Sequence, residues 1–366
     1  MPASTLPVAI TARLVEQVRS AAASGRPLVI EAGGTKSFYG NPTAGERLDP
    51  RECSGIVAYE PSELVVTARA GTLLAELESV LAARGQMLAF EPPHFGSGAT
   101  VGGCIAAGLA GPRRAATGAA SGGIRDSLLG VTLLDGRGAV LAFGGTVMKN
   151  VAGYDVSRLI AGSLGTLGVL LEASLRVVPR PAAESTLCLA LDEPAALRRC
   201  TAWMAQPWPV SATAWAEGRL HIRLSGAGSA VAAAQREFGG EVIAAQAAAE
   251  FWLAIREQTA PFFGRDGTLW RVSLPANSSP LALGLPQLLE WGGALRWLYA
   301  RGDAAPIRRR AAELGGHATL FRGERGAGGV FTPRPAPVAA LEARLRAEFD
   351  PAGIFNPGRM YADQSH

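Results

Sequence analysis

The sequence predicts an α+β fold in which two domains are followed by a short C-terminal segment. Three observations lead to this prediction. A chain of 366 residues is longer than one ordinary core requires. Strand-like runs are interspersed with amphipathic helical runs, and the pattern changes after Pro181. Residues 186–243 then read strand, helix, strand, strand, helix, strand, which is typical of a ferredoxin-like unit. We therefore predict a first domain at 1–181, a second at 182–330, and a segment at 331–366 that packs back on the first.

The first domain is expected to begin with a helix, because apolar residues share one face of residues 10–24 and Gly25 provides a stop. A buried strand at 28–30 then leads into a glycine-rich turn. The other elements expected here are strands on either side of Pro61, the second at 64–70, a helix at 72–85, a hairpin at 128–145 with its turn at Asp135-Gly136, a short helix at 155–163 and a strand that ends at Pro179.

The second domain is expected to contain a central hairpin. Its strands are Val210–Ala216 and Leu220–Leu224, and Glu217-Gly218 forms the turn. Further helices and strands are expected at 247–259, 268–274, 281–290, 294–300, 304–314 and 317–322. Beyond them we predict a mobile loop at 323–337, a last helix at 337–349 and a compact tail that is rich in turns.

The composition is that of a globular protein, with 48% hydrophobic and 18% charged residues. The net charge is +4, and the densest basic clusters, Arg113-Arg114 and Arg308–Arg310, are short and hold no aromatic residues. This pattern argues against nucleic-acid binding. The N-terminus lacks a basic region followed by an apolar stretch, so no signal peptide is expected. We predict a cytoplasmic protein whose contact with the inner membrane, where it occurs, is made through partners.

The cysteines of the chain are Cys53, Cys104, Cys188 and Cys200. No two of them form a Cys-x-x-Cys pair, which argues against a zinc or iron–sulfur site made by this chain. We expect buried free thiols in a reducing compartment.

A run of 21 residues from Pro92 to Pro112 contains no Asp, Glu, Lys or Arg. It could be a membrane helix, a linker or a loop that lies against a ligand. Its large apolar side chains are few and prolines stand at both ends, which argues against a membrane span. Of the 45 glycines, 18 lie between Gly96 and Gly168, interrupted by strand-like runs. This crowding excludes a linker and indicates unusual backbone conformations or close approach to a ligand.

Three glycine-rich segments are candidate ligand loops. In the first, EAGGTKS at 31–37, consecutive N–H groups of a glycine turn can form a nest for a phosphate, and Thr35 and Ser37 add hydroxyl donors. A plain connection after a strand is the alternative, because the segment matches neither the G-x-G-x-x-G fingerprint nor the P-loop. The second, Thr100–Gly103, lacks bulky side chains where an extended ligand could lie against the backbone. The third, at 149–170, combines close-set polar residues with glycines that flank a turn into a strand.

The order of these segments resembles the p-cresol methylhydroxylase-type FAD-binding family, which includes vanillyl-alcohol oxidase and the D-lactate dehydrogenases. The shared features are a Gly-Gly-Thr loop at 33–35, a strand that ends Ala70-Gly71-Thr72, the segment Thr100–Gly103, Arg125-Asp126 before Leu129-Gly130, Gly153–Asp155, Gly165–Gly168 and the terminal Asn356-Pro357-Gly358. Apart from the last, they cover residues 28–180. The resemblance implies an FAD-binding domain with two subdomains, followed by a smaller ferredoxin-like α+β cap of the FAD-linked oxidase type.

Longer stretches resemble a narrower family, the FAD-binding subunits of bacterial glycolate oxidase complexes. These stretches are EPPHFGSGATVGG, GLAGPRR, VMKNVAGYDVSRL and GGHATLFRG. The resemblance implies that FAD lies extended between the two subdomains, with 33–37 and 100–103 at its pyrophosphate, 165–168 toward the adenine half and 149–155 near the ring. The cofactor-binding residues that it implies are Ala32, Gly33, Gly34, Thr35, Lys36, Ser37, Gly98, Thr100, Val101, Gly102, Gly103, Arg125, Asp126, Lys149, Asn150, Gly153, Tyr154, Asp155, Gly165, Thr166, Leu167, Gly168 and Asn356.

Two departures from the family pattern bear on the chemistry. Relatives with covalent flavin often have a histidine after the glycine loop, where this chain has Lys36, so noncovalent FAD is expected. Relatives that oxidise 2-hydroxy acids also carry clustered histidines and acidic residues that bind a metal. The histidines here are far apart in the sequence, so no metal site is expected. The sequence identifies no catalytic residue, and the candidates around the ring are His317, Arg322 and Tyr154.

The leading hypothesis is an FAD-dependent oxidoreductase subunit of a glycolate or 2-hydroxy acid oxidase complex. Without ligand sets for an iron–sulfur cluster or a substrate metal, the chain is expected to exchange electrons with a paralogous FAD-containing catalytic subunit and an iron–sulfur subunit. One alternative is a stand-alone FAD-dependent 2-hydroxy acid dehydrogenase, similar to the D-lactate dehydrogenases. The other is a structural subunit that keeps the fold without turnover.

Overall fold

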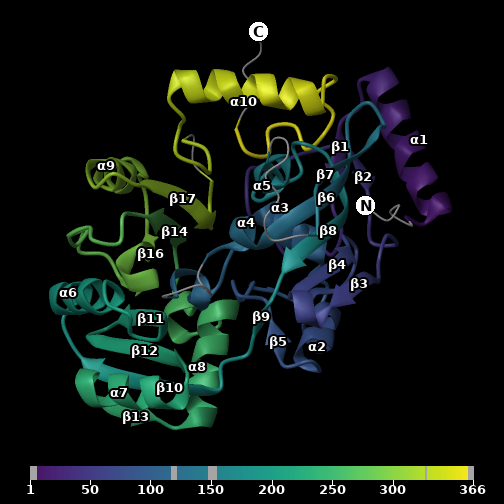
Figure 1. Cartoon of the computed structure of the whole chain (residues 1–366). Coiled ribbons are helices and arrows are strands. Elements are labelled where there is room, and N and C mark those ends of the chain that lie inside the picture. The colour runs from purple at the N-terminus through teal and green to yellow at the C-terminus, as the bar shows by residue number, and fades with distance from the viewer. Residues whose placement is uncertain (1–5, 117–121, 147–154, 326–327, 362–366) are drawn as a thin grey trace.

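The structure is a computed structural model that describes residues 6–116, 122–146, 155–325 and 328–361. Two large sheets organise it, and helices cover each of them (Figure 1). We call the chain up to residue 181 the N-terminal lobe and residues 182–322 the cap lobe. The last segment contains α10 (Ala336–Phe349) and runs from beside the cap lobe back to the N-terminal lobe. None of the helices described is long and apolar enough to cross a lipid bilayer.

The N-terminal lobe is built on a five-stranded antiparallel sheet in the order β3-β4-β8-β6-β7. Its core joins this sheet to α2 and α3. A second core joins α1 and the parallel pair β1–β2 to Ile354 and Phe355 of the tail. The elements are α1 (Val8–Ser24), β1 (Leu28–Ile30), β2 (Glu46–Leu48), β3 (Ile56–Glu60), η1 (Pro61–Glu63), β4 (Val65–Arg69), α2 (Leu74–Ala82), β5 (Gln86–Met87), α3 (Val101–Ala107), η2 (Pro112–Ala115), α4 (Ile124–Ser127), β6 (Leu128–Leu134), β7 (Val140–Gly144), α5 (Val156–Ile160), β8 (Val169–Arg176) and β9 (Val178–Pro179).

The charge-free run contains a helix that the sequence pattern did not predict. The N-cap of α3 is Thr100, whose side-chain oxygen accepts the N–H of Gly103 at 3.1 Å, and Gly108 ends the helix in the left-handed conformation. Val101 and Ile105 point into the core of the lobe. Small residues with weak helix preference hide this helix in the sequence, and packing on the sheet stabilises it.

The cap lobe is an eight-stranded antiparallel sheet in the order β13-β10-β12-β11-β15-β16-β14-β17. Its first half confirms the predicted ferredoxin-like pattern, with Glu217 and Gly218 both at positive φ in the turn of the central hairpin. The second half repeats the strand order in mirror image, so the halves meet where β11 pairs with β15. The elements are β10 (Ala183–Ala190), α6 (Glu193–Met204), β11 (Val210–Ala216), β12 (Arg219–Gly226), α7 (Gly228–Phe238), β13 (Glu241–Ile243), α8 (Ala245–Glu257), η3 (Pro261–Gly264), β14 (Thr268–Ser273), β15 (Gln287–Glu290), η4 (Trp291–Gly293), β16 (Leu295–Ala300), α9 (Ala305–Glu313) and β17 (His317–Arg322).

The turn of the β6–β7 hairpin contains the predicted Asp135-Gly136 and runs over Asp135–Ala139, because the Asp135 carboxylate accepts the N–H groups of Arg137 and Ala139. Another connection differs from the sequence pattern. The described part of 323–337, expected to be mobile, is anchored: the Arg325 side chain donates to backbone carbonyls of the N-terminal lobe, and the carbonyl of Val330 accepts the N–H of Leu320 in β17.

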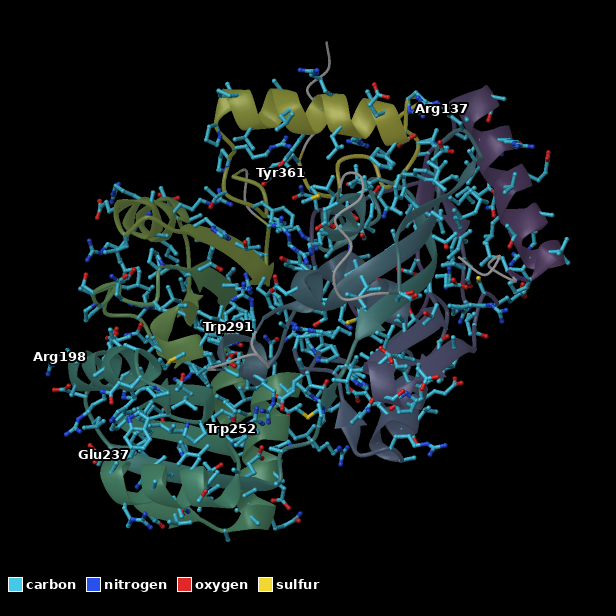
Figure 2. All side chains as sticks on the ribbon, in the orientation of Figure 1. Arg137, Arg198, Glu237, Trp252, Trp291 and Tyr361 are labelled. Atoms are coloured by element: carbon cyan, nitrogen blue, oxygen red, sulfur yellow. The ribbon has the colours of Figure 1, made fainter. Side chains whose placement is uncertain are left out.

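The two lobes meet along a seam that an apolar cluster crosses without interruption. This cluster joins Tyr39, Ala107 and Leu164 of the N-terminal lobe to aromatic residues of the cap lobe. Trp252 and Trp291, labelled in Figure 2, belong to its cap side. The indole N–H of Trp291 donates to the carbonyl of Gly111 at 3.0 Å. The seam is therefore packed like a core.

A buried charge cluster also crosses the seam. The carboxylate of Glu91 lies 3.3 Å from the guanidinium of Arg113 in its own lobe and 2.8 Å from that of Arg223 in the cap lobe. Both arginine side chains are about 5% exposed, and Glu184 of the cap lobe approaches Arg113 at 3.1 Å. Burial alone would raise the pKa of Glu91, but Arg223 and Arg113 outweigh it and hold this pKa below its usual value.

Candidate functional site

A cavity of about 130 Å³ lies in the N-terminal lobe. Separate stretches of the chain form its wall: β1 with residues 31–37, the region from Gly98 to α3, and residues 160–170. Asn356 and Arg359 of the C-terminal tail complete the wall. The glycine-rich segments that are far apart in the sequence therefore meet around one space.

The loop at 31–37 presents backbone donors to this cavity. The N–H of Ser37 donates to the carbonyl of Gly34, which closes the turn, whereas the N–H groups of residues 32–36 donate to no acceptor among the residues described. A Cβ on Gly33 would lie 1.5 Å from the carbonyl oxygen of Gly98, so the two loops touch backbone to backbone. Unpaired N–H groups beside a cavity are donors for an anionic ligand.

The segment Thr100–Gly103 contributes a wall rather than donors. Three of its N–H groups are already paired: Val101 donates to the carbonyl of Thr72, Gly102 to that of Ala70, and Gly103 to the Thr100 hydroxyl. A Cβ on Gly102 would lie 2.7 Å from that of Ala70, so this glycine is required for the packing of α3 on β4. A Cβ on Gly103 would meet only the Thr100 hydroxyl, at 3.2 Å. Gly103 is thus the position that leaves the cavity open.

The tail fixes the far wall through Asn356. Its side-chain oxygen accepts the N–H of Ile30 at 2.8 Å, and its side-chain nitrogen donates to the carbonyl of Leu164 at 2.7 Å. Asn356 and Leu164 both have positive φ, a strained conformation that asparagine tolerates well and leucine tolerates poorly. The buried side chain of Asn356 therefore fixes the position of β1 relative to the turn at 160–170.

Replacing Asn356 by alanine is expected to lower the free energy of unfolding by about 2–3 kcal/mol, because a buried donor and a buried acceptor lose their partner. Urea denaturation of the protein without ligand measures this change. A variant as stable as the parent would contradict the role given to this side chain.

The cavity wall carries two cations without a carboxylate partner. Lys36 Nζ donates to the carbonyl of His94 at 3.1 Å, and Arg359 donates to the carbonyls of Ser37 and Asn41 at 2.9 and 3.1 Å. Burial lowers the pKa of both groups. Neither cation has an acidic side chain within ion-pair distance among the described residues. Glu257 and Glu31 interact electrostatically with Lys36 and Arg359 without forming an ion pair, so an anionic ligand in the cavity would give both cations a direct partner.

The comparisons with known proteins now identify the family. The family described as "FAD binding domain" matches residues 4–158. Over 350 residues the chain is 48% identical to the glycolate oxidase subunit GlcE of Escherichia coli (strain K12), which covers 96% of this chain and 97% of the relative. The chain belongs to the GlcE family.

More distant relatives share only part of the GlcE-family chain. The glycolate oxidase subunit GlcD of Bacillus subtilis (strain 168) is 33% identical over 171 residues, which are 46% of this chain and 35% of that protein. A solved structure of alkyldihydroxyacetonephosphate synthase superposes with a TM-score of 0.64 and 16% identity, over 94% of this chain and 74% of that one. The second likeness shows the fold alone and agrees with the predicted α+β class.

The cavity of this GlcE-family chain gathers most of the predicted cofactor residues. Those that line it are Ala32, Gly33, Gly34, Thr35, Lys36, Ser37, Gly98, Thr100, Gly102, Gly103, Gly165, Gly168 and Asn356. Lys149, Asn150, Gly153 and Tyr154 lie outside the described residues. The cavity fits FAD in its chemistry, since its lining residues supply unpaired N–H groups and two cationic side chains, which are donors suited to a diphosphate.

Other predicted residues do not line this cavity, each for a local reason. Val101 and Leu167 point into the core of the lobe, and the hydroxyl of Thr166 donates to the carbonyl of Ser163. Asp155 caps α5 and pairs with the nearby Arg158 at 3.2 Å. Arg125 and Asp126 are exposed on α4, where the Asp126 carboxylate accepts the N–H of Gly123.

The catalytic candidates do not form one site. His317 and Arg322 stand at opposite ends of β17, roughly 16 Å apart along the strand, and Tyr154 lies outside the described residues. His317 is exposed at the start of the strand. The Arg322 guanidinium packs on the rings of Phe38 and Phe95 at 4.4 and 4.8 Å. In the part of the chain that the structure describes, no group of three His, Cys, Asp or Glu side chains could hold a metal ion.

The sequence pattern missed several residues of the cavity. Glu31 lines it and accepts the Ser37 hydroxyl, and Ser163 and Leu164 lie in the turn that Asn356 holds. Arg359 directly follows Asn356-Pro357-Gly358, so the position beside that motif was the available signal. Ala106 and Ala107 could be recognised only once α3 was known to be a helix, one turn after Gly102 and Gly103.

Proposed function

We propose that this chain is the FAD-holding subunit of a glycolate oxidase complex and binds FAD noncovalently in the cavity described above. The observation that carries the proposal is the cavity wall, which combines N–H groups at 32–36, for which the described part of the chain supplies no acceptor, with two cations, Lys36 and Arg359, for which it supplies no ion-paired carboxylate. The 48% identity with a glycolate oxidase subunit over nearly the whole chain supports it. The proposal includes the division of the chain into an FAD-binding domain at 1–181, a cap domain at 182–330 and a segment at 331–366 that packs back on the first domain.

The residues of the cavity have distinct roles in this proposal. The N–H groups at 32–36 and the Arg359 guanidinium bind the diphosphate, and Asn356 orients the wall that carries Arg359. Gly103 leaves room for the cofactor. Bound FAD supplies hydride and electron transfer.

Noncovalent attachment agrees with the groups beside the glycine loop. Position 36 holds a lysine whose ammonium donates a hydrogen bond to the carbonyl of His94. The thiol that interacts electrostatically with it, Cys104, is fully buried, and burial raises its pKa to about 12. Such a thiol stays protonated and is a poor nucleophile toward a flavin ring.

We further propose that electrons pass between this flavin, a paralogous FAD-containing catalytic subunit and an iron–sulfur subunit. Two relatives bear the names of different subunits of one enzyme, GlcE and GlcD, which supports a complex of several chains. Glycolate or a similar small 2-hydroxy acid is the substrate at the level of that complex.

The chain purified alone tests these proposals. We expect a yellow protein whose flavin is released by acid precipitation, identified as FAD, and not bleached by anaerobic glycolate or D-lactate. A colourless protein that cannot be reconstituted with FAD would overturn the cofactor proposal. It would favour the alternative that the chain is a structural subunit without turnover. Flavin retained in the precipitate would overturn noncovalent attachment.

A second candidate function is oxidation of a 2-hydroxy acid by this chain itself. The observation that favours it is Arg271, a half-buried guanidinium at the lobe seam with no carboxylate within ion-pair distance among the residues described. Bleaching of the isolated protein by glycolate or D-lactate would establish this function and overturn the electron relay.

A further inference from the structure

Lysine is rare in this chain, and one of its lysines belongs to the cofactor cavity. Of the 35 basic residues, Lys36 and Lys149 are lysines and the rest are arginines. Lys36 lines the cavity, whereas Lys149 lies outside the described residues. An ammonium is a compact charge whose pKa responds to its surroundings, while a guanidinium stays charged. The groups that hold Lys36 therefore decide what it offers to a ligand.

One peptide unit of the N-terminal lobe holds the Lys36 ammonium. Lys36 Nζ donates to the carbonyl of His94 at 3.1 Å and lies 5.6 Å from the centre of the Phe95 ring. The His94 carbonyl and the Phe95 N–H belong to the same peptide bond, which we call the 94–95 peptide. Its N–H donates to the carboxylate of Glu257 at 2.8 Å. The 94–95 peptide thus bridges an ammonium and a carboxylate, and each of the two hydrogen bonds polarises the other.

The carboxylate of this bridge comes from the other lobe. Glu257 is the last residue of α8, on the side of the cap lobe that faces the N-terminal lobe (Figure 1). The helix dipole disfavours a carboxylate at the C-terminal end of a helix. The N–H groups of His94 and Phe95, at 3.1 and 2.8 Å, and the guanidinium of Arg256, at 2.8 Å, offset that cost. Glu257 therefore stabilises the loop at 91–96 and not its own helix.

The loop that carries the 94–95 peptide is strained. Glu91 and Phe95 have φ of 42° and 55°, in the left-handed region that residues other than glycine rarely adopt. Such a conformation persists only where surrounding contacts enforce it. The Glu257 carboxylate supplies one of these contacts at Phe95. Without it, the carbonyl of the 94–95 peptide loses a constraint on its direction toward Lys36.

The charged and titratable groups around Lys36 come from different elements. Burial lowers the pKa of the Lys36 ammonium, whereas Cys104 of α3 and Glu257 of α8 raise it. Burial raises the pKa of Cys104 to about 12, so this thiol is uncharged near neutral pH. The ring of His94 pairs with Glu78 of α2 at 3.0 Å. Near neutral pH, Glu257 is therefore the charged group of this set that favours the protonated form of Lys36.

We infer that Glu257 is a positioning residue of the cofactor cavity: it fixes the Lys36 ammonium through the 94–95 peptide, so a carboxylate of the cap lobe contributes to the binding of FAD in the N-terminal lobe. The inference rests on the proposed function, because the diphosphate of FAD is the anionic ligand in question. It adds a dependence on the cap lobe that the cavity wall alone does not imply, since neither Glu257 nor residues 91–95 line the cavity.

The variant Glu257→Gln tests the inference, because the amide keeps the size and one acceptor oxygen of the side chain but loses its charge. FAD affinity is measured by titrating the full chain after removal of bound ligand. We expect Glu257→Gln to weaken FAD binding by about fivefold, the difference between a charge-assisted and a neutral hydrogen bond. Lys36→Met is expected to weaken binding at least as much, and Glu257→Gln is expected to add nothing in that background.

The matched control is Glu250→Gln. Glu250 lies on the same helix, is exposed, and accepts a hydrogen bond from Gln246 of that helix. FAD affinity is expected to stay at the value of the parent protein in this variant.

The reactivity of the Lys36 amine gives a second readout that needs no FAD. Acetic anhydride acetylates the deprotonated amine, and mass spectrometry separates Lys36 from Lys149, the other lysine of the sequence. The midpoint of reactivity against pH reports the pKa of Lys36, whereas a more open seam would change the limiting rate. Because Glu257→Gln removes a charge that favours the protonated form, we expect this midpoint to fall and acetylation near neutral pH to rise by about threefold relative to Lys149.

The outcomes separate the inference from a structural role and from the cofactor proposal. Weaker FAD binding and a lower midpoint in Glu257→Gln, with neither in Glu250→Gln, support the inference. An unchanged midpoint in Glu257→Gln overturns it. The same loss of FAD affinity in the Lys36→Met background also overturns it, because Glu257 would then act on the fold and not through Lys36. A chain that binds no FAD while its midpoint still falls in Glu257→Gln would overturn the cofactor proposal and support the link between Glu257 and Lys36.

Discussion

Replacing Glu91 by glutamine is expected to lower the free energy of unfolding by about 3–5 kcal/mol, the loss typical of a broken buried ion pair. Among the residues described, the change leaves Arg113 and Arg223 buried with Glu184 as their one remaining ion-pair partner, and Glu184 is 42% exposed. Because Glu91 joins both lobes, the loss also loosens the seam. Urea denaturation followed by tryptophan fluorescence measures it, since Trp252 and Trp291 lie at the seam.

A matched control is Glu217→Gln, which removes an ion pair with Arg265 that is exposed in solvent. This change is expected to cost less than about 1 kcal/mol. Equal losses in the two variants would show that the buried cluster adds no more stability than a surface pair.

The same cluster makes stability depend on pH in a defined direction. The pKa of Glu91 in the folded protein lies below its value in the unfolded chain, which is about 4.3. Its contribution is therefore fully present above that value and is lost as the pH falls through the lower, folded pKa. We expect the acid sensitivity of the parent to be reduced in Glu91→Gln, and identical pH profiles would contradict this assignment.

Gly103→Val is expected to abolish FAD binding while the flavin-free fold remains intact. The new side chain would extend from the exposed face of α3 at the cavity wall, where its Cβ meets only the Thr100 hydroxyl. Because valine prefers helix slightly more than glycine does, the helix itself is not weakened. Flavin absorbance per protein and the urea midpoint of the flavin-free protein are the two measurements.

Gly102→Val provides the contrast at the neighbouring position. A Cβ there would collide with Ala70 of the N-terminal lobe, so we expect destabilisation of the flavin-free protein by about 1–3 kcal/mol as well as loss of flavin. Normal flavin content in Gly103→Val would show that the cofactor does not approach α3.

Much of the fold could be predicted from local patterns. The Glu217-Gly218 turn and the alternating strands around it indicated the ferredoxin-like half, and Gly25 marked the end of α1. Helix α3 could not be predicted, because its N-terminal N–H groups are paired with Thr72 and Ala70, about thirty residues earlier in the chain. Hydrogen bonds to residues so distant in the chain are tertiary interactions, and local sequence propensity does not predict them.

The candidate sites divide in the same way. The loop at 31–37 and Asn356 belong to short motifs that can be read in sequence, and the structure brings them to one cavity. The small cavity at the lobe seam was not predictable, because Gln258 lies at the end of α8 whereas Arg271 and Glu290 lie on different strands. Only the tertiary fold brings these three residues to one cavity.

The mirrored cap sheet has a consequence for how this protein associates. Each half closes one open edge of the other at the β11–β15 pair, so only β13 and β17 remain as outer strands. β13 is three residues long, and the chain at 330–332 covers β17 through hydrogen bonds to Ala318 and Leu320. A sheet bounded in this way offers no long row of free backbone groups to a foreign strand, which protects the cap against edge-to-edge aggregation.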